Sequence, residues 1–75
     1  MDIERIFTDR LNSIEKGTII IHNSVMYPVK VKKQKNGKFI TWQNRTKNIF
    51  INEIDLLDYL YMNIFSFSWG KMWIE

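Results

Sequence analysis

The sequence contains no cysteine, and it has only one histidine and three glycines among its 75 residues. Without cysteine the chain can form no disulfide, no thiolate metal site and no cysteine nucleophile. A single imidazole, that of His22, excludes the multi-histidine spacings of zinc sites. The glycines, at positions 17, 37 and 70, are too far apart to form a glycine-rich phosphate loop. We therefore expect a protein that uses no cofactor and no metal and is not an enzyme.

The remaining catalytic patterns are weak. No serine lies in a nucleophile motif that would pair with His22. Asp55 and Asp58 are three residues apart and could share a proton or a metal ion on one helical face. Acids in a first helical turn, however, ordinarily compensate the helix dipole. The sequence thus favours binding over catalysis.

Long hydrophobic runs are also missing. The most apolar stretch, residues 54–69, is interrupted by Asp55, Asp58 and Asn63, which is unlike a membrane span. Residues 1–5 are charged and lack the apolar region of a signal peptide. We expect a soluble, cytoplasmic protein that makes no membrane contact.

Alanine is absent as well, whereas isoleucine, asparagine and lysine together supply 27 of the 75 residues. Folding does not require this bias, but AT-rich coding DNA produces it. The composition is therefore typical of a phage or another mobile element, and it suggests the cytoplasm of a bacterial host as the location.

The residues that are present suit one small domain. With 45% hydrophobic and 15% aromatic residues, the chain can close a core with bulky side chains and without disulfides. A length of 75 residues is too short for two separate cores. We expect residues 1–75 to form a single α+β domain.

Two segments have helical spacing. Residues 2–16 carry a stripe of apolar residues that ends at Gly17, which predicts an N-terminal helix. Asn52 is a good N-cap for a second helix that runs to about residues 63–65. The inner stripe expected for the second helix consists of Ile54, Leu57, Tyr61 and Ile64, widened by Leu56 and Leu60.

Between the helices the sequence favours strands. Residues 19–21, 25–34 and 47–51 are rich in β-branched residues or alternate in polarity. The predicted fold is an N-terminal helix, a small antiparallel sheet of three to four strands with a central Asn-Gly hairpin, a second helix, and a short aromatic C-terminal strand or extension.

Asn36-Gly37 is the strongest turn signal, because this pair favours a two-residue type I′ hairpin loop. Such a loop pairs Val31 with Trp42 and Lys33 with Ile40. The resulting core face consists of Tyr27, Val29, Val31, Ile40 and Trp42. The resulting solvent face consists of Lys30, Lys32, Gln34, Phe39, Thr41 and Gln43.

Charge is unevenly distributed along the chain. Residues 16–52 contain eight lysines and arginines and no acid, whereas the flanking segments are acidic. A basic hairpin of this kind can neutralise phosphates, with an aromatic ring on the same face to stack on a base. It can also serve only to keep the protein soluble. The candidate binding residues are Lys30, Lys32, Lys33, Lys35, Lys38, Phe39, Arg45 and Lys47.

The C-terminal segment is rich in large apolar residues. It can complete the core, or it can form an interface with a protein partner or with a second copy of the chain. The candidate residues of this aromatic patch are Phe67, Trp69, Met72 and Trp73.

Two functions follow as hypotheses. The first is a small phage protein that docks on a host protein with an acidic surface and modulates or inhibits it; the aromatic patch would anchor the partner and the lysines would steer it. The alternative is an accessory protein that binds DNA or RNA through the basic hairpin. The acidic helices limit the surface that can face a polyanion, but they do not hinder docking on a protein. The sequence therefore favours docking on a host protein.

Overall fold

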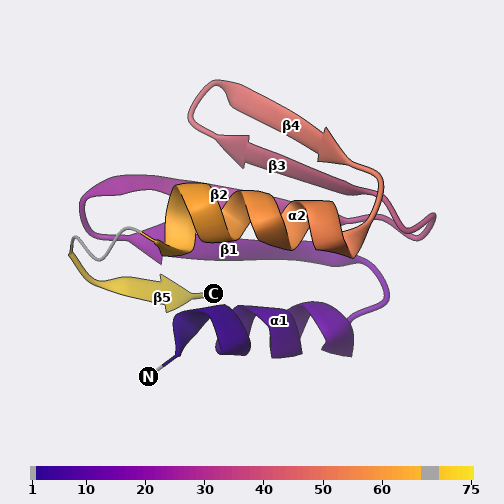
Figure 1. Ribbon diagram of the computed structural model, residues 1–75, viewed down its shortest axis with the longest axis horizontal. Helices are drawn as coiled ribbons and strands as arrows, with labels where there is room; N and C mark the ends of the chain where they lie inside the picture. The colour runs from indigo at the N-terminus through magenta and orange to yellow at the C-terminus, as the bar shows by residue number, and fades with distance from the viewer. Residues whose placement is uncertain (1, 67–69) are drawn as a thin grey trace.

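The computed structural model describes residues 2–66 and 70–75 (Figure 1). The elements in chain order are α1 (Ile3–Ser13), β1 (Gly17–Asn23), β2 (Met26–Lys33), β3 (Phe39–Gln43), β4 (Thr46–Phe50), α2 (Glu53–Leu60), the π-helical turn η1 (Tyr61–Phe65) and β5 (Met72–Ile74). The α+β class and the antiparallel sheet are confirmed.

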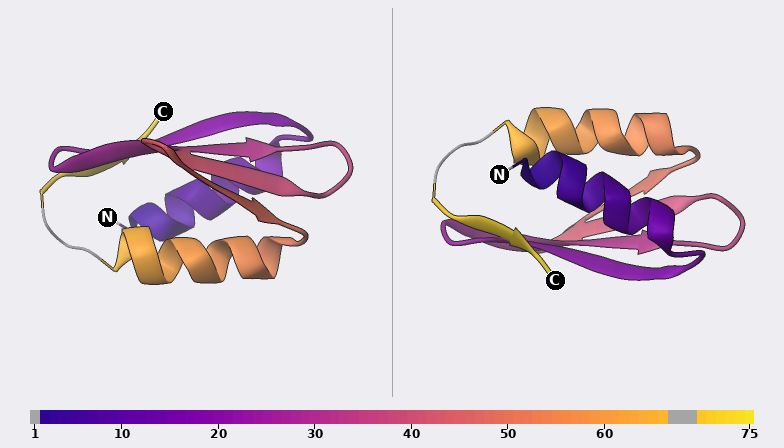
Figure 2. Two further views of the ribbon diagram at one scale, coloured as in Figure 1. Left: turned by 90° about the horizontal axis from the view of Figure 1, so that it is seen from above. Right: turned by 90° about the horizontal axis from the view of Figure 1, so that it is seen from below.

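The sheet has five strands in the order β4-β3-β2-β1-β5, all antiparallel to their neighbours. Both helices lie on the same side of this sheet, as the two views of Figure 2 show. No helix in the described part of the chain covers the other side, which we call the outer face.

The helices begin where the sequence predicts. The side chain of Asp2 accepts a hydrogen bond from the Arg5 N–H at the start of α1, and Asn52 accepts one from the Asp55 N–H at the start of α2. The first helix ends at Ser13, earlier than expected, and Gly17 belongs to β1.

The predicted inner stripe of α2 is partly wrong. Leu56, Leu60 and Ile64 are buried, but Ile54 and Tyr61 are 73% and 55% exposed. Apolar residues cover most of the circumference of this helix, so periodicity alone does not fix its rotation. In the structure, the side of the helix that carries Leu56 and Leu60 faces the core.

The core fills the space between the sheet and the two helices. Phe7 and Leu11 of α1 have no exposed surface, and the Phe7 ring lies 5.7 Å from that of Phe65. The other buried hydrophobic residues are Ile19, Ile21, Val29, Val31, Phe39, Leu56, Leu60 and Ile64.

The predicted register of the central hairpin is wrong by one residue. Val31 pairs with Thr41, and Lys30 pairs with Trp42. The loop has three residues, since the Gln34 N–H donates to the Lys38 carbonyl at 3.0 Å. Gly37 alone in this loop has positive φ, of 85°, so the turn is not type I′.

The shift turns every side chain of β3 over, because neighbouring residues of a strand point to opposite faces. Phe39 is buried, at 4% exposure, and Thr41 is buried beside it. Ile40 and Trp42 lie on the outer face, whereas Val31 of β2 points into the core. The expectation of Trp42 in the core and Phe39 in solvent is therefore wrong.

The C-terminal segment closes the sheet as a fifth strand. Strand β5 pairs with β1, with Trp73 opposite His22, while Met72 and Ile74 pack against the core. The predicted aromatic residues Phe67 and Trp69 lie outside the described residues. None of the helices that the structure describes has the length and apolar character needed to cross a bilayer.

Candidate functional site

The outer face of the sheet carries aromatic and cationic side chains side by side. Trp42 is the central residue of one row, with Lys30 opposite it on β2 and Lys47 opposite it on β4. In the next row, Lys32 and Ile49 flank Ile40. Because neighbouring strands are about 4.8 Å apart, the backbones of the two lysines in the Trp42 row are separated by about 10 Å.

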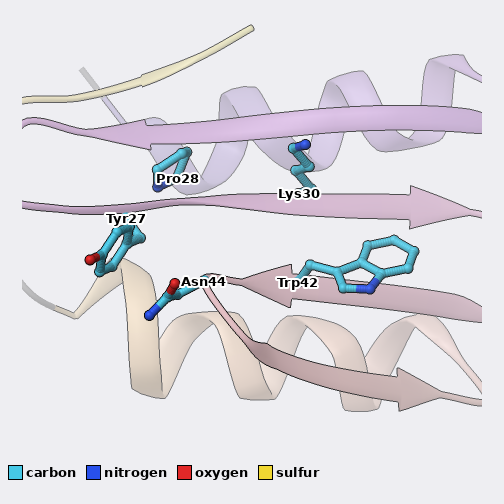
Figure 3. Close-up of a pocket in the computed structure, with 5 residues that line it drawn as sticks. All are labelled: Tyr27, Pro28, Lys30, Trp42 and Asn44. Atoms are coloured by element: carbon cyan, nitrogen blue, oxygen red, sulfur yellow. The ribbon is translucent and has the colours of Figure 1, made fainter.

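The Trp42 ring is positioned to receive a planar group. Figure 3 shows its indole broadside over β3, with the helices behind the sheet. The Lys47 ammonium lies over this ring, 5.8 Å from its centroid. Such a contact is worth about 0.5–1 kcal/mol at an exposed site, so a stacking ligand can displace the ammonium.

The predicted basic residues divide among three places. Lys30, Lys32 and Lys47 lie on the outer face, and Arg45 lies in the β3–β4 turn. Lys35 and Lys38 flank the tip of the β2–β3 loop and are exposed.

Lys33 is the exception, because it points toward the helices. Its Nζ donates a hydrogen bond to the Leu11 carbonyl at 3.0 Å, in the last turn of α1. An ammonium group at this place satisfies a terminal carbonyl, and its positive charge interacts favourably with the negative end of the helix dipole. Lys33 therefore contributes to the structure and is not part of the outer face.

Two pockets open along β2. The first, which we call the Trp42 pocket, has a volume of about 540 Å³ and is lined by Tyr27, Pro28, Lys30, Trp42 and Asn44 (Figure 3). The second, the lysine pocket, has a volume of about 610 Å³ and is lined by Lys16, Gly17, Lys32, Lys33, Gln34, Lys35 and Asn36. The two pockets lie near opposite ends of β2, where Lys30 lines the first and Lys32 lines the second. A continuous cationic path thus follows this strand.

A second aromatic surface lies at the β1–β5 edge. The rings of His22 and Trp73 are stacked, with centroids 5.1 Å apart and planes inclined by 10°. His22 Nε2 is also 3.3 Å from the Glu75 carboxylate. Trp73 is 45% exposed, whereas Met72 is part of the inner side, so the predicted aromatic patch does not form one surface among the described residues.

Acidic residues lie mainly on the helical side. Helix α1 and its cap carry Asp2, Glu4 and Asp9, and α2 carries Glu53, Asp55 and Asp58. The five described strands contain no acid; Glu15 lies two residues before β1, and Glu75 directly follows β5. The molecule is therefore bipolar, with a cationic outer face and an acidic helical layer.

No cluster suited to metal binding is found in residues 2–66 and 70–75. Within them, no three histidine, aspartate or glutamate side chains are close enough to hold a metal ion together. The Asp55 carboxylate contacts the Asn52 side chain at 3.3 Å, which places it in the cap of α2.

Sequence reasoning found the outer-face lysines but missed Trp42. The lysines follow from the acid-free composition of residues 16–52, which does not depend on register. One signal in the sequence pointed to the correct face for Trp42. A two-residue loop would pair Lys35 directly with Lys38, and two like charges in such a pair destabilise a hairpin. Comparison with known proteins adds no assignment: no family model matches the chain, and no curated protein or solved structure has significant similarity to it.

Proposed function

We propose that this chain is a non-enzymatic protein that binds single-stranded nucleic acid on the outer face of its sheet, in the cytoplasm. The observation that supports this most directly is the row formed by Lys30, Trp42 and Lys47. Single-strand binders combine cations that follow the backbone with aromatic rings on which bases stack. This row supplies two cations and an aromatic ring on three neighbouring strands.

The charge distribution supports the same proposal. Lys30 and Lys32 continue toward the lysine pocket, so successive phosphates can be neutralised along β2. The acids of the helices face the opposite side of the sheet, where they repel a bound strand least. An acidic helical layer therefore orients the polyanion without preventing its binding.

The test is a titration of a fluorescent twelve-nucleotide oligomer, as DNA and as RNA, at several salt concentrations. If three phosphates are neutralised, the logarithm of the binding constant falls with that of the salt concentration with a slope of about −2. Lys30→Gln, Lys32→Gln and Lys47→Gln should each reduce this slope by about 0.7. Trp42→Ala should weaken binding by roughly 5- to 100-fold with little change in slope.

The matched control removes the same charge from the helical layer. Arg5 and Arg10 are exposed on α1, so Arg5→Gln and Arg10→Gln should leave affinity nearly unchanged. Equal losses from the α1 and the outer-face variants would show that net charge alone is responsible. Failure of both DNA and RNA to bind at low salt would refute the proposal.

A second candidate is docking on a host protein with an acidic surface, leading to inhibition of that protein. It is supported by Ile49 and Trp73, which are 61% and 45% exposed on the same face as the lysines. Exposed apolar side chains within a cationic surface suit a protein interface. Ile49→Ser should weaken capture of such a partner after nuclease treatment, and it should affect oligonucleotide binding little.

A further inference from the structure

The Trp42 pocket lies where the ladder between β2 and β3 ends. Val29 and Gln43 form the last backbone pair, and beyond it the Gln43 side chain donates to the Tyr27 carbonyl at 3.2 Å. This bond holds the backbone at Tyr27 beside β3 while the Tyr27 side chain remains 63% exposed. The pocket is thus framed by fixed backbone on both strands.

The walls of the pocket suit a flat aromatic ligand. Tyr27 and Pro28 line one end, and Trp42 lines the other, with Lys30 on the β2 side (Figure 3). The apolar walls bury a base, and the ammonium group can pair with the phosphate of the same nucleotide. A volume of about 540 Å³ is large enough for a purine.

Asn44 supplies a polar group at the rim. Its backbone has positive φ, of 56°, as the first residue of the two-residue loop between β3 and β4. Its carboxamide makes no hydrogen bond with the other residues that the structure describes, so its donor and its acceptor are both free. A carboxamide can bind N7 and N6 of adenine at the same time, whereas guanine presents two acceptors on this edge.

We propose that the Trp42 pocket holds one base of the bound strand and that Asn44 selects adenine there. This proposal rests on the proposed function, because it requires a strand on the outer face. It adds a base preference to binding that the lysines make independent of sequence.

The experiment compares three twelve-nucleotide strands: oligothymidine, and the same strand with one central adenine or one central guanine. The adenine strand should bind roughly 5- to 10-fold more tightly than the guanine strand, in the lower part of the range for a bidentate contact. Guanine is the matched control, because it stacks as a purine but has a different hydrogen-bonding edge. A uridine-based RNA series distinguishes DNA from RNA as the source of the base.

Asn44→Gly is the informative variant, since glycine accepts a positive φ without strain. It should reduce the adenine preference to less than about twofold and leave the salt slope unchanged. Tyr27→Ala, at an exposed residue, should weaken binding of both purine strands.

The outcomes separate the two proposals. Equal affinity for the three strands, or an adenine preference that persists in Asn44→Gly, overturns base selection while binding to the outer face stands. Absence of binding to every strand at low salt overturns the proposed function together with base selection.

Discussion

Ser24 and Lys71 exchange two hydrogen bonds although they are 47 residues apart in the sequence. The Ser24 N–H donates to the Lys71 carbonyl at 2.9 Å, and the Lys71 N–H donates to Ser24 Oγ at 2.8 Å. This exchange joins the β1–β2 turn to the chain just before β5. It thereby fixes the start of the edge strand that carries Trp73.

Gly70 allows this close approach, which leads to a first prediction. Its φ is 75°, and an added Cβ would lie 2.5 Å from Ser24 Oγ and 3.0 Å from a Val25 methyl group. Gly70→Ala should destabilise the protein by about 2 kcal/mol through backbone strain and loss of this contact. Urea denaturation measures the change, and hydrogen exchange should be faster in β5.

Gly37 provides the control for this prediction. It too has positive φ, of 85°, but an added Cβ would meet nothing within 4 Å. Gly37→Ala should therefore cost only about 1 kcal/mol, from the left-handed conformation alone. If the two variants lose the same stability, steric contact with Ser24 is not important for docking β5.

A second prediction tests the register of β3. Phe39 is 4% exposed in the core, so Phe39→Ala should cost about 3–5 kcal/mol. Trp42 lies half-buried on the outer face, and Trp42→Ala should cost less than about 1 kcal/mol. Both free energies of unfolding are measured in the same denaturation assay. A larger loss for Trp42→Ala than for Phe39→Ala would contradict this register and support the two-residue loop.

The register shows which parts of the fold the sequence can predict. Both helices follow from their apolar spacing and the second cap from Asn52, and the structure bears these out, whereas the capping role of Asp2 was not predicted. The β2–β3 hairpin is also correctly located. Its loop length was not predictable from Asn36-Gly37 alone, because this pair fits a three-residue loop with glycine in the left-handed region as well as a type I′ turn.

Hydrophobic alternation could not correct this error. In β3, Ile40 and Trp42 are together more apolar than Phe39 and Thr41, so the pattern favours the wrong face. The core instead accepts Phe39, which pairs with Phe50 of β4. Only the packing of all five strands against the helices distinguishes these alternatives, and that information is not local in the sequence.

A third prediction concerns the cap of α2. Asn52 Oδ1 accepts a hydrogen bond from the Asp55 N–H at 2.8 Å, and Asn52→Ala should cost about 1 kcal/mol. Asn63 is a matched control, since its exposed carboxamide near the end of the same helical segment donates only to the Tyr59 carbonyl, at 2.9 Å, and caps no N–H of the helix. Asn63→Ala should be close to neutral in thermal denaturation, and an equal loss at both positions would argue against a capping role.

A final prediction separates structural from binding lysines at adjacent positions. Lys33 donates to the Leu11 carbonyl on the helical side, whereas Lys32 is exposed on the outer face opposite Ile40. Lys33→Gln should lower the free energy of unfolding by about 1 kcal/mol, because the α1 carbonyl loses a charged donor. Its effect on the salt slope of oligonucleotide binding should be small.

Lys32→Gln should behave in the opposite way. We expect the stability to change by less than about 0.5 kcal/mol, since an exposed lysine makes no buried contact. The salt slope should fall by about 0.7, because one phosphate contact is lost. The two residues are lysines of the same β-strand on opposite faces. Equal effects on the slope would therefore mean that the bound oligonucleotide does not distinguish the two faces of the sheet, and the binding surface would have to be sought elsewhere.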